Sequence, residues 1–185
     1  MTRMPERPSS RTSLLIGSTL SMWLLWAADL VWPGNIGHGI VPRTTYGLRG
    51  IVMAPFIHVD LQHLLANTIP FLILGALILL RGRRAFLFVV LVSAGVSGLG
   101  TWLFGTPNTH HVGASGVVFG FLGYLLVRAA YDRRISSALI AIGIATLYGA
   151  TFLTSLMPAA GISWTGHVFG FLGGVTSARM RYRRA

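Results

Sequence analysis

The sequence has no cysteine, no lysine and only four acidic residues in a chain of 185. The absence of cysteine excludes disulfide bonds, thiolate chemistry and cysteine-ligated zinc. Charged residues make up 10% of the chain, hydrophobic residues make up 53%, and the mean hydropathy is +0.67. A water-soluble domain must cover its surface with polar groups, and this composition does not supply them. We therefore expect the protein to fold within a lipid bilayer.

Six long apolar runs, separated by short loops that carry arginine, can be recognised along the chain. Each run is close to the roughly 20 residues that a helix needs to cross about 30 Å of hydrocarbon. We predict an all-α, polytopic membrane bundle of six transmembrane helices over residues 13–178, with a disordered cytoplasmic tail at 1–12 and a basic cytoplasmic tail at 179–185. The stretch at about 33–56 is rich in glycine and proline and is predicted to form a structured, partly embedded loop. The runs lie at about residues 13–32, 57–80, 85–104, 112–130, 135–156 and 161–178.

The distribution of the basic residues, all arginines, predicts the orientation of the chain. In a six-span arrangement, all but two of the fifteen arginines fall on one side, and only Arg43 and Arg49 fall on the other. By the positive-inside rule, the arginine-rich side, which includes both termini, is cytoplasmic. The net charge of +11 does not indicate nucleic-acid binding, because the arginines form small clusters at the membrane boundaries, where they meet lipid headgroups. The arginine-only composition, rich in alanine and glycine, favours a prokaryotic plasma membrane.

Four polar side chains within the apolar runs are candidates for function, because such groups are costly inside a membrane. His63 and Asn67 are spaced i, i+4, which places them on one face of the second span. Ser115 lies at the head of the fourth span and His167 near the head of the sixth. Counting about 1.5 Å of helical rise per residue from the arginine that ends each span places all four about 10 Å or less beneath the outer face.

The sequence GASG around Ser115 indicates the start of a helix. A helix that begins there is too short to cross the bilayer, so the segment before it must enter the membrane as irregular backbone, which needs protein or water around it. We therefore predict a water-filled cavity that opens outward and is lined by the four polar residues. The head of this helix also presents unpaired N–H groups that can stabilise an oxyanion.

The glycines of the fourth and sixth spans predict that these two helices pack closely. They recur at intervals of three and four residues, which lets membrane helices approach with their backbones in contact. Close packing would bring His167 within about 2.6–3.2 Å of Ser115, so that the imidazole can remove the hydroxyl proton. Phe119 follows Ser115 by one turn and is expected to pack against the imidazole. The glycines are Gly113, Gly116, Gly120 and Gly123 in the fourth span and Gly166, Gly170, Gly173 and Gly174 in the sixth.

Three segments, HVDLQHLLAN, GASGVVFGFLGY and GHVFGFLGG, together resemble the signature of the rhomboid intramembrane serine proteases, in the order and spacing of that family. The resemblance implies that Ser115 is the nucleophile and His167 the general base, in a dyad without aspartate. It further implies that His63 and Asn67 join the Ser115 N–H in an oxyanion hole. His58 matches a histidine that ties the first outer loop to the second span.

The chain departs from the family pattern at some positions. Phe119 stands where many members have tyrosine, so a hydroxyl contact is lost but ring packing remains, and apolar Leu79 stands where glutamate is often found. These differences concern loop architecture and substrate gating more than the chemistry. We therefore expect Phe119, with Gly113, Gly116 and His58, to support the site.

The remaining histidines and acidic residues are not expected to take part in chemistry. His110 and His111 lie in an outer loop, where we expect solvated or interfacial side chains. Asp60 is expected to cap the second span or to face the loop, and Asp132 is expected to pair with neighbouring arginines. Neither provides a third member for a catalytic triad.

These patterns predict a serine endopeptidase that cuts single-span membrane proteins in or near their transmembrane segments. The alternative within the same family is an inactive scaffold that binds membrane proteins, against which the retention of Ser115 and His167 argues. A transporter or channel is disfavoured because no ionisable residue continues the polar cluster into the cytoplasmic half. A metalloprotease is disfavoured because there is no H-E-x-x-H motif. We expect no metal and no cofactor.

Overall fold

The computed structural model describes residues 8–33, 39–132, 134–159 and 161–182. This part of the chain is helical and forms no β-strand, so the all-α prediction is confirmed for it. A short 3₁₀ helix, η1 (Ala54–Phe56), lies between the second and third α-helices. The α-helices are α1 (Pro8–Val31), α2 (Gly47–Met53), α3 (Leu61–Leu79), α4 (Arg83–Phe104), α5 (Ser115–Asp132), α6 (Ile135–Ser155) and α7 (Trp164–Tyr182).

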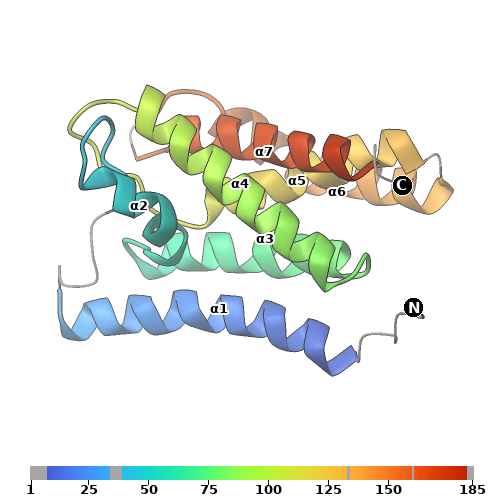
Figure 1. Ribbon diagram of the computed structural model, residues 1–185, viewed down its shortest axis with the longest axis horizontal. Helices are drawn as coiled ribbons and strands as arrows, with labels where there is room; N and C mark the ends of the chain where they lie inside the picture. Colours follow the sequence, from blue (N-terminus) through green and yellow to red (C-terminus); the bar gives the residue numbers. More distant parts are fainter. Residues whose placement is uncertain (1–7, 34–38, 133, 160, 183–185) are drawn as a thin grey trace.

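Helix α5 is the central helix of the bundle. It contacts α3, α4, α6 and α7, and α7 packs in turn against α4. Helix α1 forms one edge of the molecule, next to α3, while α2 packs against α4 at one end of the bundle (Figure 1). The first ten residues of α5 after Ser115 are therefore buried among the other helices.

Four helical segments are long and apolar enough to cross a membrane, which indicates a multi-pass membrane protein. They are Thr12–Val31 within α1, and α3, α4 and α6. The six-span prediction is not confirmed by this measure, because α5 and α7 are not among the four. Both helices pack largely against other helices, and a helix in that position carries glycines and small polar residues where a lipid-facing helix carries large apolar ones.

Two helix ends differ from the predicted boundaries. Helix α1 begins at Pro8, inside the segment predicted to be a disordered tail, and α7 continues to Tyr182, into the segment predicted to be a basic tail. Apolar composition marks the lipid-facing length of a helix, whereas arginine favours helix as strongly as leucine does and extends it further. Residues 1–7 and 183–185 of the two predicted tails lie outside the described residues. Of the loop predicted at 33–56, residues 39–56 are structured and contain α2 and η1, whereas residues 34–38 lie outside the described residues.

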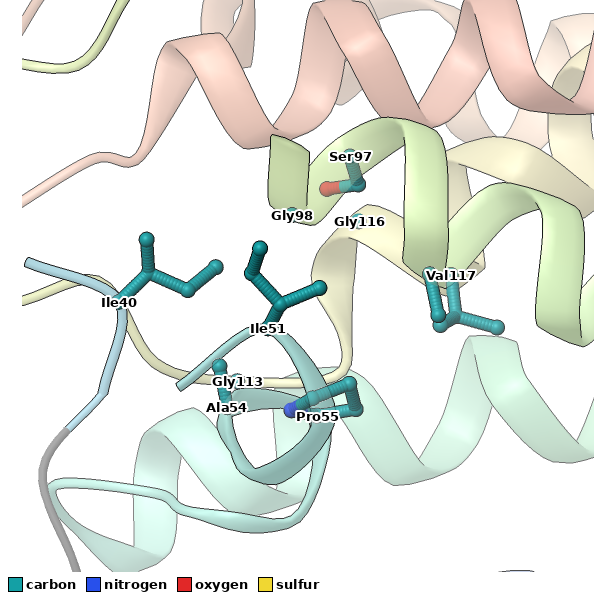
Figure 2. Close-up of a pocket in the computed structure, with 10 residues that line it drawn as sticks. Ile40, Ile51, Ala54, Pro55, Ser97, Gly98, Gly113, Gly116 and Val117 are labelled. Carbon is teal, nitrogen blue, oxygen red and sulfur yellow. The ribbon is translucent and has the colours of Figure 1, made fainter. Parts of the chain in front are cut away.

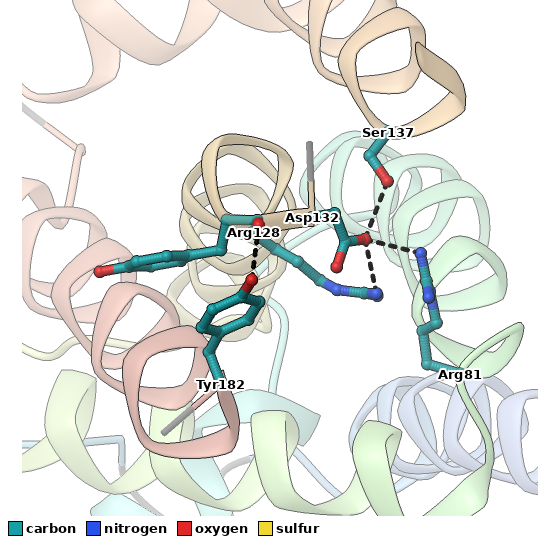
Figure 3. A network of polar contacts seen from close by, with 6 residues as sticks. Arg81, Arg128, Asp132, Ser137 and Tyr182 are labelled. Carbon is teal, nitrogen blue, oxygen red and sulfur yellow. Dashed lines mark hydrogen bonds and ion pairs between the residues drawn. The ribbon is translucent and has the colours of Figure 1, made fainter. Parts of the chain in front are cut away.

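A polar network joins the helices at the end of the bundle opposite to the head of α5 (Figure 3). Asp132, the last residue of α5, accepts hydrogen bonds at Oδ2 from Arg81 (2.8 Å) and from Arg128 (2.7 Å). The same oxygen accepts from Ser137 of α6 (2.9 Å). Tyr182 of α7 donates to a backbone carbonyl of α5 at 2.7 Å. The predicted pairing of Asp132 with neighbouring arginines is confirmed.

Glycines allow α5 and α7 to pack with their backbones in contact. A Cβ placed on Gly170 would overlap the carbonyl oxygen of Gly116, and a Cβ placed on Gly174 would overlap the carbonyl oxygen of Gly120. Any larger residue at these positions would force the two helices apart. The predicted close approach of these helices is thus confirmed.

This contact predicts that Gly174→Ala destabilises the protein, although alanine ordinarily stabilises a helix relative to glycine. Because the new methyl group meets backbone, which cannot turn away, we expect a loss of about 1–3 kcal/mol in the free energy of unfolding. Unfolding of the purified protein in detergent would measure it. Gly143→Ala in α6 is the matched control, since nothing lies within 4 Å of its added Cβ. Equal stabilities of the two variants would contradict the packing argument.

Candidate active site

The structure brings Ser115 and His167 together at the heads of two adjacent helices. Ser115 is the first residue of α5, and His167 lies in the first turn of α7. The distance from His167 Nε2 to Ser115 Oγ is 2.9 Å, and the histidine is only 8% exposed. The phenyl ring of Phe119 stacks on the imidazole, with 4.2 Å between ring centroids and an interplanar angle of 4°. Both the predicted contact and the predicted ring packing are confirmed as geometry.

A backbone carbonyl fixes the tautomer of His167. Its Nδ1 lies 2.8 Å from the carbonyl oxygen of Ser155, at the end of α6. A carbonyl oxygen can only accept a hydrogen bond, so Nδ1 carries the proton of the neutral ring. Nε2 is then left to accept the hydrogen bond that the Ser115 hydroxyl donates. The pair is therefore arranged for proton transfer from Ser115 to His167.

His63 and Asn67 of α3 face the chain just before Ser115. A Cβ placed on Gly113 would lie 2.6 Å from His63 Nε2 and 3.6 Å from Asn67 Nδ2. Gly113 has a φ of 106°, a conformation that favours glycine. Asn67 donates one amide hydrogen to the His63 carbonyl at 2.9 Å, which leaves its second amide hydrogen for another acceptor. Two side-chain donors thus converge near the head of α5.

His58 lies between the outer loop and α3. It is 2% exposed, its Nδ1 is 3.4 Å from the Phe56 carbonyl oxygen, and its ring centroid is 5.1 Å from that of His63. Burial, together with a smaller effect of the neighbouring His63, lowers the pKa of His58 to about 4. The ring therefore stays neutral at physiological pH and places no positive charge beside His63.

A cavity of about 30 Å³ borders the backbone on either side of Ser115 (Figure 2). Gly113 and Gly116 line it on one side, and Ile51 and Ser97 are among the residues that complete it. This volume exceeds the roughly 10–15 Å³ that one water molecule needs. The predicted cavity was to be lined by the four polar residues, and none of these lines this one.

Two features of the site were not found from the sequence. The sequence gives no signal for the role of the Ser155 carbonyl, because every residue carries a backbone carbonyl. The contacts of His111, which was expected to be solvated or interfacial, were also not foreseen: the side chain is partly buried, with Nδ1 2.7 Å from Ser163 Oγ and Nε2 2.8 Å from Thr109 Oγ1. His110 is exposed, as expected.

The fold and the site together define a class: a helical, multi-pass membrane protein with a serine–histidine pair at the head of its central helix. A family model described as the Rhomboid domain matches residues 46–184, and the chain belongs to the rhomboid family. The resemblance inferred from the three sequence segments is therefore confirmed.

Similar proteins occur in several bacteria. An uncharacterized protein of Mycobacterium tuberculosis is 39% identical over 149 residues, which cover 76% of this chain and 62% of the relative. The putative rhomboid protease YdcA of Bacillus subtilis is 31% identical over 119 residues, covering 64% of this chain and 59% of the relative. The rhomboid protease GlpG of Photorhabdus laumondii is 32% identical over 126 residues, covering 64% of this chain and 41% of the relative. The aligned part is thus 62% of the mycobacterial relative's length and less of the other two.

Proposed function

We propose that this protein is an intramembrane serine endopeptidase. The observation that carries the proposal is the 2.9 Å contact between Ser115 Oγ and His167 Nε2, at the head of a helix that other helices enclose. Membership of the rhomboid family supports it, as does the name of the relative from Photorhabdus laumondii.

In the proposed mechanism, His167 accepts the proton of Ser115 while Ser115 Oγ attacks the carbonyl carbon of the scissile peptide bond. The Ser115 N–H, His63 and Asn67 donate hydrogen bonds to the resulting oxyanion. The protonated His167 then gives its proton to the leaving amine, and an acyl-enzyme forms on Ser115. Water, activated by His167, hydrolyses this ester and restores the free enzyme.

A backbone carbonyl takes the place that an aspartate holds in a catalytic triad. The Ser155 carbonyl accepts the Nδ1–H of His167 and keeps the ring in the tautomer that the reaction needs. It also stabilises the imidazolium form that develops during the attack, through its dipole. A carboxylate in this part of the membrane would be more costly to bury than a carbonyl.

The proposed topology has six membrane-spanning helices, with α5 and α7 as the inner two and both termini in the cytoplasm. The site then lies in the outer part of the bilayer, in the plasma membrane of a prokaryote. Its substrates are proposed to be single-span membrane proteins, whose helices unwind locally to present an extended peptide bond to Ser115.

Replacement of Ser115 by alanine is expected to abolish cleavage of a single-span membrane substrate while leaving the fold intact, because only the side-chain hydroxyl group is replaced by a hydrogen atom. Cleavage by the purified protein in detergent or liposomes would measure this. Ser18→Ala is the matched control, since among the described residues the Ser18 hydroxyl in α1 bonds only to the Leu14 carbonyl of its own helix. Cleavage by the Ser115→Ala protein at the wild-type rate would refute the proposal.

Replacement of Asn67 by alanine is expected to slow turnover by about 10²–10³, as the loss of one oxyanion-hole donor does in other proteases. Because the donor acts on charge that develops in the transition state, KM should change little. Steady-state kinetics with a fluorogenic substrate would separate the two constants. An unchanged kcat with a raised KM would assign Asn67 to substrate binding instead.

A further inference from the structure

A second serine–histidine contact lies four residues ahead of the first in each of the two segments. His111 Nδ1 is 2.7 Å from Ser163 Oγ, and these two residues are 52 apart in the sequence, as are Ser115 and His167. Each member of the second pair precedes a member of the first by four residues (His111 before Ser115, Ser163 before His167), in the irregular backbone that leads to each helix. The second contact therefore joins the segments that lead into α5 and α7.

The backbone of His111 is held firmly in place. Its N–H donates to the Ile40 carbonyl at 2.9 Å, and its carbonyl accepts from the Ile40 N–H at 2.8 Å. The two backbones can approach this closely because residue 39 is glycine: a Cβ at that position would overlap the His111 carbonyl. The imidazole thus projects from a segment that is anchored on the outer loop.

The direction of the hydrogen bonds around the His111 ring can be deduced. Thr109 donates its hydroxyl hydrogen to the Thr106 carbonyl at 2.6 Å, so Thr109 Oγ1 must accept from His111 Nε2–H at 2.8 Å. In the neutral ring Nδ1 then has no hydrogen and accepts the hydroxyl hydrogen of Ser163. Burial, with a smaller effect of nearby His110, lowers the pKa of His111, which favours this neutral ring.

Ser163 connects this chain of hydrogen bonds to the base. It immediately precedes α7, and its carbonyl accepts the backbone N–H of His167 at 3.1 Å. A displacement of Ser163 therefore moves the first turn of α7, and with it the imidazole of His167. Ser163 therefore contacts the segment before α5 through its hydroxyl and the first turn of α7 through its carbonyl.

We propose that His111 is a positioning residue for the Ser115–His167 pair: by accepting the Ser163 hydroxyl hydrogen, it sets the first turn of α7 against the segment that leads into α5. This inference rests on the proposed function, because its effect is exerted on the proton transfer between Ser115 and His167. It assigns no chemical step to His111 itself.

Three variants test this role. His111→Phe keeps a ring but removes both nitrogen atoms, and Ser163→Ala removes the partner hydroxyl. His111→Asn keeps an acceptor near the position of Nδ1. We expect the first two changes each to lower kcat, and the rate at which a phosphonate probe labels Ser115, by about tenfold, with little change in KM. His111→Asn should recover most of the wild-type rate.

The double variant His111→Phe with Ser163→Ala distinguishes positioning from general destabilisation. If both residues act through one hydrogen bond, the double variant should be no slower than either single variant. His110→Phe, which removes an exposed histidine from the same loop, should label at the wild-type rate. Thermal unfolding of each protein would be measured in parallel.

Wild-type kinetics of the His111→Phe protein, multiplicative losses in the double variant, or failure of His111→Asn to restore the rate would each overturn the proposal. The proposed function fails separately, if the Ser115→Ala protein retains cleavage. A wild-type protein that cleaves, a Ser115→Ala protein that does not, and a fully active His111→Phe protein would refute only the role of His111.

Discussion

The close approach of α5 to α7 is the contact on which the rest of the site depends. Gly170 and Gly174 meet the backbone of Gly116 and Gly120 without any side chain between them. Only at this separation can a histidine in the first turn of one helix reach a serine at the head of the other, at 2.9 Å. The same contact explains why these two helices look unlike lipid-facing spans in composition: their neighbours are helices, and their small residues are needed for packing.

The surroundings of His167, the proposed base, show how an imidazole can be oriented in a membrane protein without an acidic partner. A neutral carbonyl holds Nδ1, a phenyl ring stacks on one face of the imidazole, and a backbone hydrogen bond from the His167 N–H fixes the turn that carries it. Each of these groups is uncharged, so the site avoids the cost of a buried carboxylate. The arrangement also gives both ends of the connection between α6 and α7, at Ser155 and Ser163, a part in positioning His167.

Sequence patterns predicted the helical class, the contact between Ser115 and His167, and the packing of Phe119, because these depend on helical periodicity and on small residues at fixed intervals. They did not predict the Ser155 carbonyl or the contacts of His111, because both depend on how loops of irregular backbone fold over the helix heads. Composition predicted six spans, of which the measure of length and apolarity supports four, because α5 and α7 are long enough but fall short of its apolarity.

Covalent labelling of Ser115 by an active-site phosphonate, compared between the wild type and His167→Ala, tests the central claim most directly. The probe reacts with a serine only when a neighbouring base removes its proton, so it reports the dyad without requiring a natural substrate. The account predicts that Ser115 is labelled in the wild type, that Phe119→Tyr keeps the labelling, and that His167→Ala abolishes it. Undiminished labelling of the His167→Ala protein would show that another group activates Ser115 and would contradict the account.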